Sequence, residues 1–135
     1  MKTNFKIILS LGAVALFTLS LVAFSIPQDA WVVPAKYKTM KNAFAGGDED
    51  GVGEDLYAQH CKSCHGKEGM GDGTKARELK TEMRDLSGKE VQSQADGELY
   101  YKAIIGRDEM PNFEKKIRDE EDRWMTVNFM RSLAE

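Results

Sequence analysis

The chain has 135 residues, with 19 lysines and arginines against 22 aspartates and glutamates and a formal net charge of −3 at pH 7. This acidic balance argues against a nucleic-acid-binding protein, which would need an excess of basic side chains. Two cysteines and two histidines are the whole supply of thiol and imidazole groups.

Residues 1–25 are typical of an export signal. Lys2 and Lys6 give a positive start, Ile7 to Phe24 is mostly apolar, and Ala23-Phe24-Ser25 offers a small-x-small cleavage site. The apolar stretch is about 18 residues, the lower limit for crossing a bilayer, so an uncleaved N-terminal anchor is the alternative. Both interpretations predict an exported domain, either periplasmic or anchored on the periplasmic side of the membrane.

Residues 26–50 are expected to form a linker, because they contain two prolines, two adjacent glycines and an acidic run but few periodic apolar positions. Within this stretch, Trp31-Val32-Val33-Pro34 and Asn42-Ala43-Phe44 permit two interpretations, packing against the domain surface or an exposed tether. The folded domain is expected over residues 51–135. A domain of about 85 residues gains only marginal stability from an apolar core alone.

Three main helices are predicted in this domain. The first covers residues 52–64, where apolar and cysteine positions recur at i, i+3, i+4 and i+7. The second begins with Asp96 as its N-cap and ends at Gly106. The third begins near Asp119, whose acidic neighbours suit the positive N-terminal end of a helix, and runs to the end of the chain. Glycine-rich loops are expected between the first two helices, and no segment has the pattern of a strand.

The run Cys61-Lys62-Ser63-Cys64-His65 has the C-x-x-C-H spacing of covalent haem attachment. Two thiols three positions apart on one helical turn can each add across a vinyl group of the porphyrin, and the adjacent imidazole then reaches the iron from the proximal side. The porphyrin would also supply the apolar core that so small a domain lacks. We therefore predict one covalently attached haem c, bound by Cys61 and Cys64, with His65 as an iron ligand.

Three other uses of these residues fit less well. A disulfide between two cysteines this close on a helix is sterically awkward and closes too short a loop to stabilise much. A thioredoxin-like redox pair needs a βαβ context that the chain lacks. Structural zinc needs four tetrahedral ligands, whereas every cysteine and histidine lies within residues 60–65.

From residue 51 to residue 133 the chain resembles the class I c-type cytochromes, in particular their small bacterial monohaem members. The likeness rests on Gly53-x-x-x-Tyr57-x-x-x-Cys61 leading into Cys64-His65-Gly66, on Gly106-Arg107-Asp108-Glu109-Met110-Pro111, and on an aromatic-bearing terminal helix. It implies an all-α, cytochrome c-like fold with three main helices and loops wrapped round one haem. It also implies that Gly53 and Tyr57 meet the last helix near Phe129, because glycine permits close backbone approach.

A low-spin electron carrier needs a second axial iron ligand, and methionine is the residue type left to supply it. Met110 follows a glycine stop, precedes a stiffening proline and lies 45 residues after His65. Spacing and resemblance together favour Met110, and Met83 stays open as an alternative. The predicted metal ligands are therefore His65 and Met110, a pair that raises the reduction potential relative to two histidines. No catalytic residue is expected.

These features predict a monohaem c-type cytochrome that carries single electrons in a respiratory or periplasmic chain and is not an enzyme. Its partners would be a redox protein donor and acceptor, with a membrane tether as an option and no nucleic acid. Two alternatives stay open. One is a haem enzyme or gas sensor with an open distal site, and the other is a fixed electron-transfer subunit of an oxidase or dehydrogenase complex.

Overall fold

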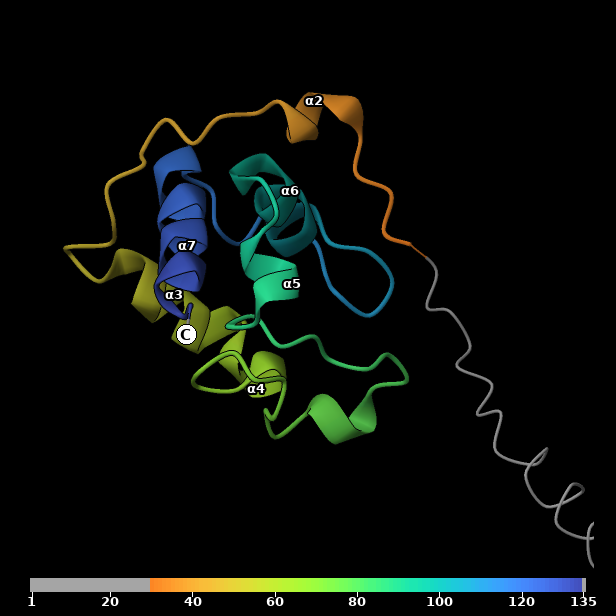
Figure 1. The fold of residues 1–135 in the computed structure, drawn as a ribbon. Coiled ribbons are helices and arrows are strands. Elements are labelled where there is room, and N and C mark those ends of the chain that lie inside the picture. The colour runs from red at the N-terminus through yellow and green to blue at the C-terminus, as the bar shows by residue number, and fades with distance from the viewer. Residues whose placement is uncertain (1–29, 135) are drawn as a thin grey trace, which may run out of the picture. The chain divides into compact units, whose positions relative to one another are not determined.

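The computed structural model describes residues 30–134, and its compact unit begins at Val32 (Figure 1). The predicted export signal, residues 1–25, lies outside the described residues. Among residues 30–134, no helix combines the length and the apolar character needed to cross a membrane.

The described part of the chain is helical, as the sequence predicts, and its only extended pairing is an isolated bridge between Arg107 and Met110. The first predicted helix is present as α3 (Val52–His60) and α4 (Lys62–His65), which are separated at Cys61. The other elements are α2 (Ala35–Lys38), a 3₁₀ turn (Ala76–Glu78), α5 (Lys89–Gln92), α6 (Asp96–Tyr100), a π-helical turn (Tyr101–Ile105) and α7 (Glu120–Ser132).

The predictions of helix ends have different outcomes. The start of the third helix near Asp119 is confirmed, and Asp119 caps α7, because its carboxylate accepts a hydrogen bond from the Glu121 backbone N–H at 2.9 Å. Asp96 is instead the first helical residue of α6, so its assignment as N-cap is wrong. Its carboxylate accepts from Arg131 on α7, with Nη2 at 2.7 Å and Nε at 3.0 Å. The predicted stop at Gly106 is confirmed, since this glycine ends the π-helical turn that continues α6.

Helices α3 and α7 cross closely, as the family resemblance implies. The rings of Tyr57 and Phe129 pack with centroids 5.1 Å apart. Gly53 lies one turn earlier and faces the backbone of Met125 on α7. The close approach therefore extends along α7 from Met125 to Phe129.

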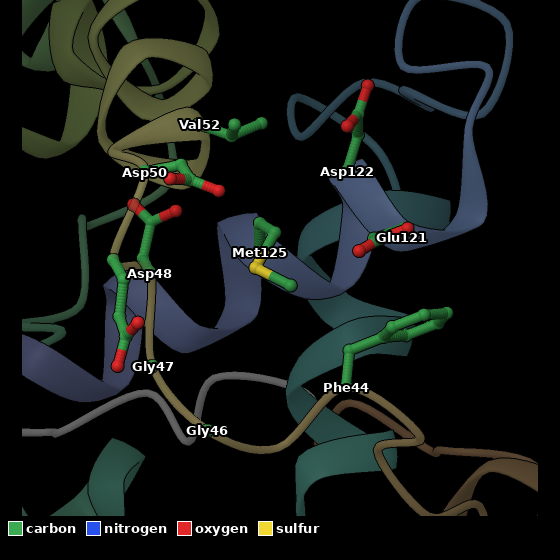
Figure 2. Close-up of a pocket in the computed structure, with 10 residues that line it drawn as sticks. Phe44, Gly46, Gly47, Asp48, Asp50, Val52, Glu121, Asp122 and Met125 are labelled. Atoms are coloured by element: carbon green, nitrogen blue, oxygen red, sulfur yellow. The ribbon is translucent and has the colours of Figure 1, made fainter.

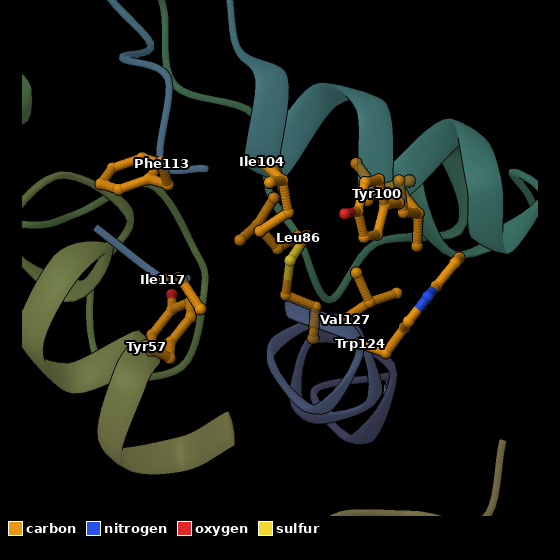
Figure 3. Packing of buried hydrophobic residues seen from close by; sticks show 12 residues of the cluster. Tyr57, Leu86, Tyr100, Ile104, Phe113, Ile117, Trp124 and Val127 are labelled. Atoms are coloured by element: carbon orange, nitrogen blue, oxygen red, sulfur yellow. The ribbon is translucent and has the colours of Figure 1, made fainter. Parts of the chain in front are cut away.

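The core lies between α3, α6 and α7 and takes in the segment that precedes α7. Figure 3 shows Tyr57 from α3, Tyr100 and Ile104 from the α6 region, and Trp124 and Val127 from α7. Trp124 and Tyr100 pack with ring centroids 4.6 Å apart, which joins α7 to α6. Of the predicted iron ligands, His65 lies at the end of α4, which follows α3, and Met110 lies in the loop after the α6 region.

Residues 32–50, here called the N-terminal segment, pack against the domain, although the sequence places them in a linker. Figure 1 shows this segment passing over α6 and α7 before it reaches α3. The side chain of Val33 is 4% exposed, whereas that of Val32 is 79% exposed. Tyr37 on α2 packs against Tyr101 at 4.7 Å between ring centroids. A Cβ at Gly97 would lie 2.0 Å from the Tyr37 carbonyl oxygen, so α2 rests directly on the backbone of α6.

Asn128 on α7 holds the far end of the N-terminal segment. Its Nδ2 donates to the carbonyl oxygens of Phe44 and Gly47, both at 2.9 Å, and its Oδ1 accepts from Asn42 at 2.6 Å. The Asn128 side chain is buried, so water cannot readily replace these bonds. The asparagine therefore fixes the segment to the domain.

Asn128→Ala should destabilise the protein and free the N-terminal segment. The change removes the hydrogen bonds to two backbone carbonyls and to the Asn42 amide, and each such bond contributes about 0.5–1.5 kcal/mol. The measurements are the denaturation midpoint and the rate of proteolytic cleavage within residues 42–47. Ser132→Ala, on an exposed part of α7, is the control. Equal cleavage rates for the wild type and Asn128→Ala would show that the segment is held elsewhere.

Candidate functional site

The C-x-x-C-H motif lies at the junction of α3 and α4. Both cysteines are free thiols and half-buried. Burial, and secondarily the neighbouring Cys64, raises the pKa of the Cys61 thiol to about 12, so this thiol stays protonated at neutral pH. Burial lowers the pKa of His65, so its imidazole is neutral, which is the form that ligates metals.

The loop that follows the motif folds back and is hydrogen-bonded to it. Four successive backbone carbonyls at the end of the motif accept hydrogen bonds, so none of them is left unsatisfied at the helix end. The pairs are Lys75 N–H to Ser63 (2.8 Å), Gly73 N–H to Cys64 (3.2 Å), Gly71 N–H to His65 (2.8 Å) and Tyr57 O–H to Gly66 (2.8 Å). Gly73 must be glycine here, because a Cβ would lie 2.5 Å from the Ser63 oxygen.

The donor set fits a covalently bound haem. Nδ1 of His65 is buried and has no hydrogen-bond partner among the residues that the structure describes. A buried polar atom without a partner is uncommon and calls for an explanation. Two free thiols on the same turn and a neutral, half-buried imidazole are what a haem c needs, so the residues present fit the group.

The Met110 loop, defined as residues 106–111, is a tight turn built on Gly106. This glycine has φ +70°, and a Cβ on it would lie 2.3 Å from the Met110 carbonyl oxygen. The Met110 N–H donates to the Arg107 carbonyl at 2.8 Å, and Asp108 at the tip also has a positive φ of 50°. Met110 is half-buried and packs against the core.

The structure brings the motif and the Met110 loop together through two rings. Phe113, three residues after Met110, is buried and packs against His60 with ring centroids 5.7 Å apart. His60 directly precedes Cys61. Burial, and secondarily Lys116, lowers the pKa of His60. The two segments that carry the predicted haem-binding residues are therefore neighbours, although 45 residues separate His65 from Met110 in sequence.

The other methionines occupy different surroundings. Met70 is exposed (48%) and Met130 is buried in the core (6%). Met40 packs against α6 through Gly97. Met83 is half-buried in the loop region after the motif, beside the backbone of Gly71. Met83 is therefore also near the motif, because the Gly71 N–H donates to the His65 carbonyl. Met110 differs in lying in a turn followed by Phe113, which packs against His60 at the end of α3.

A hollow lies between the N-terminal segment and the start of α7 (Figure 2). Figure 2 shows Met125 from α7 in this hollow, with Phe44 and several carboxylates around it. Its lining contains no cysteine or histidine and half of its residues are acidic, so it does not fit a haem. Among residues 30–134, no cluster of three or more acidic, histidine or cysteine side chains is arranged to bind a metal ion. Met125 is therefore far less suited than Met110 to ligate iron.

Glu109 in the Met110 loop is a residue that the sequence did not single out. Its carboxylate accepts hydrogen bonds from the backbone N–H groups of Lys80 and Thr81 and from the Thr81 hydroxyl. These bonds, that of the Thr81 hydroxyl first, lower the pKa of Glu109. The available signal was an acidic residue directly before the predicted ligand, but its partners lie 28 and 29 residues away and cannot be read from spacing.

A helical domain with a C-x-x-C-H turn, a neutral, half-buried histidine and a methionine loop nearby has the features of a c-type cytochrome. Residues 49–130 match the family model described as "Cytochrome C oxidase, cbb3-type, subunit III", and the chain belongs to this family. It is similar to a solved structure described as "KustC0563 c-type cytochrome", with 29% identity and a TM-score of 0.52 over 62% of this chain and 98% of that one. No curated protein sequence matches significantly.

These comparisons confirm the class I c-type cytochrome resemblance and the all-α, cytochrome c-like fold. The protein is thus an electron-transfer haem protein with covalently bound haem c and its iron. Redox proteins are its partners, and no feature of the described residues indicates nucleic-acid binding.

Proposed function

We propose that this protein is a monohaem one-electron carrier that works outside the cytoplasmic membrane, with haem attached to Cys61 and Cys64 and iron ligated by His65 and Met110. The observation that carries the proposal is the half-buried, neutral His65, whose buried Nδ1 has no partner among the described residues, on the same turn as two free thiols. The Met110 loop packs beside this turn through Phe113 and His60.

When bound, the haem iron supplies the chemistry by alternating between the ferric and ferrous states. The two cysteines would hold the porphyrin covalently, so the cofactor is not lost from a small domain. His65 and Met110 would both ligate the iron, so the protein would leave it no open position for oxygen or peroxide. The Met110 thioether would favour the ferrous state, and the buried rings of the core would keep water away. On this proposal the protein transfers electrons and is not an enzyme.

The family description favours a second candidate, a fixed electron-transfer subunit of a terminal oxidase. The chemistry would be the same, but the domain would not diffuse between its donor and acceptor. Residues 1–25 would act as a cleaved signal for a free periplasmic carrier or as an anchor for a membrane-bound one. Fractionation of cells into periplasm and washed membranes separates the two, as does co-purification of an oxidase with the tagged full chain.

Met110→Ala should leave haem attached and open the distal position, because neither the thioether bonds nor His65 depends on this side chain. The weak far-red absorption band that marks sulfur ligation of ferric iron should disappear. The ferrous protein should bind carbon monoxide rapidly, and the reduction potential should fall.

Met83→Ala is the matched control for this test and should change none of the three properties. The opposite pattern in the two variants would move the axial assignment to Met83. Rapid carbon monoxide binding by the unmodified protein would instead favour the haem enzyme or gas sensor.

A further inference from the structure

One side chain of the Met110 loop reaches across to a segment far away in sequence. The Glu109 carboxylate accepts the Lys80 N–H at 3.1 Å, the Thr81 N–H at 2.8 Å and the Thr81 hydroxyl at 2.7 Å. A carboxylate that accepts several bonds at once makes stronger hydrogen bonds than a neutral acceptor, and two backbone donors fix its position. Glu109 thus joins the tip of the loop to residues 80–81 at a defined distance.

These hydrogen bonds complete a connection between the two predicted ligand segments. The motif helix is bonded to the loop that follows it through Lys75 and Ser63, and this loop continues through the 3₁₀ turn (Ala76–Glu78) to Lys80 and Thr81. Glu109 then links Thr81 to the Met110 loop. At the loop's other end, Phe113 packs against His60. The loop is therefore held on both sides of Met110.

The tip of the loop has little packing of its own. Asp108 and Glu109 are exposed, and Asp108 has a left-handed backbone, which is unfavourable for a residue with a Cβ. The ion pair between Arg107 and Asp108 joins two neighbouring residues of the loop. The hydrogen bonds of Glu109 reach out of the loop and connect this exposed tip to residues 80–81.

We propose that Glu109 is a positioning residue. Its hydrogen bonds with Lys80 and Thr81, here called the Glu109 contact, keep the Met110 loop closed and so keep the methionine sulfur on the iron. The inference rests on the proposed function, in which Met110 is the axial ligand. An external ligand binds only when the sulfur has left the iron, so the rate of binding reports how often the loop opens. Removing the Glu109 contact raises the population of the open loop.

The experiment measures cyanide binding to the ferric holoprotein, together with the far-red sulfur-to-iron band. Glu109→Ala should bind cyanide about tenfold faster and show a weaker band, because several bonds to a charged group are lost. Thr81→Val should give a smaller increase, since the two backbone donors remain, and Thr81→Ser should restore the wild-type rate. Combining Glu109→Ala with Thr81→Val should add nothing to Glu109→Ala alone, because the two residues act through one contact.

Glu114→Ala is the matched control, because it removes one exposed carboxylate four residues after Met110 whose bonds stay within residues 112–114. It should leave the rate and the band unchanged. If the wild type shows the band but binds cyanide as fast as Glu109→Ala does, the proposed role of the Glu109 contact is wrong and Met110 ligation stands. If the wild type lacks the band, Met110 ligation is wrong, and so is the role of the Glu109 contact. Should Glu109→Ala fail to mature, the Thr81→Val and Thr81→Ser pair decides, and equal rates in that pair reject the proposal.

Discussion

Replacing both Cys61 and Cys64 by serine should abolish covalent haem attachment. Each thiol makes one thioether bond, and both lie free on the same turn, half-buried beside the neutral His65. Each single replacement should leave one thioether at most and reduce the yield of mature protein. Haem staining of the denatured protein on a gel, with intact mass, measures attachment directly.

Ser63→Ala is the control for this prediction, because Ser63 lies between the two cysteines, is exposed and makes only a 3.9 Å contact with the Cys64 sulfur through its side chain. It should carry haem as the wild type does. Haem that stays with the denatured double variant would mean that another residue forms the covalent bond. The double variant should also fold poorly, since a domain of this size depends on the ligand for part of its core.

The local features of the fold were predictable from the sequence. The spacing of Cys61, Cys64 and His65 allows few other uses, and the helical period around it locates α3 and α4. Asp119 and Gly106 act through the backbone within a few residues, so their roles as helix start and helix stop could be read directly. The assignment of Cys61, Cys64, His65 and Met110 to the haem stays a prediction until the variants are measured.

The packing of the N-terminal segment was not predictable, because its contacts span most of the chain. Asn42 and Asn128 are 86 residues apart, and nothing in the composition of either region indicates the pair. Asp48 belongs to an acidic run that resembles a solvated linker. In the structure its carboxylate accepts the N–H groups of Gly53 and Glu54, both at 2.8 Å, and so caps the first turn of α3.

The start of α6 shows how a local rule can be displaced by a tertiary contact. Asp96 has the right residue type for an N-cap, but its carboxylate pairs with Arg131 of α7 instead. The capping hydrogen bond at this helix start is made by Glu98 instead, whose carboxylate accepts the Ala95 N–H at 3.1 Å. Sequence reasoning can list the groups able to cap a helix, but the choice between them depends on which distant side chain competes.

The crossing of α3 and α7 leaves no room for a side chain at Gly53. A Cβ built there would lie 2.0 Å from the carbonyl oxygen of Met125 and 2.5 Å from its carbonyl carbon. Both are backbone atoms of a 13-residue helix, so they cannot move aside as a flexible side chain would. Relief requires the two helices to separate, which would also part Tyr57 from Phe129.

Gly53→Val should therefore lower the free energy of unfolding by about 3 kcal/mol, the upper end of the usual cost of overpacking. Part of that loss comes from parting the packed rings of Tyr57 and Phe129. The far-red band of the holoprotein should persist in whatever folds, because Gly53 contacts neither His65 nor Met110. Denaturant unfolding measures the stability, and the absorption spectrum reports the iron.

The matched control is Gly46→Val, because a Cβ at Gly46 meets nothing within 4 Å. That variant adds the same side chain to an exposed glycine and should change stability by less than about 0.5 kcal/mol. Similar midpoints for the two variants would mean that α3 and α7 do not cross tightly in solution. Gly53 and Tyr57 pack one face of α3 against α7 and so place the C-x-x-C-H turn against the core. With similar midpoints, other residues would have to provide this packing.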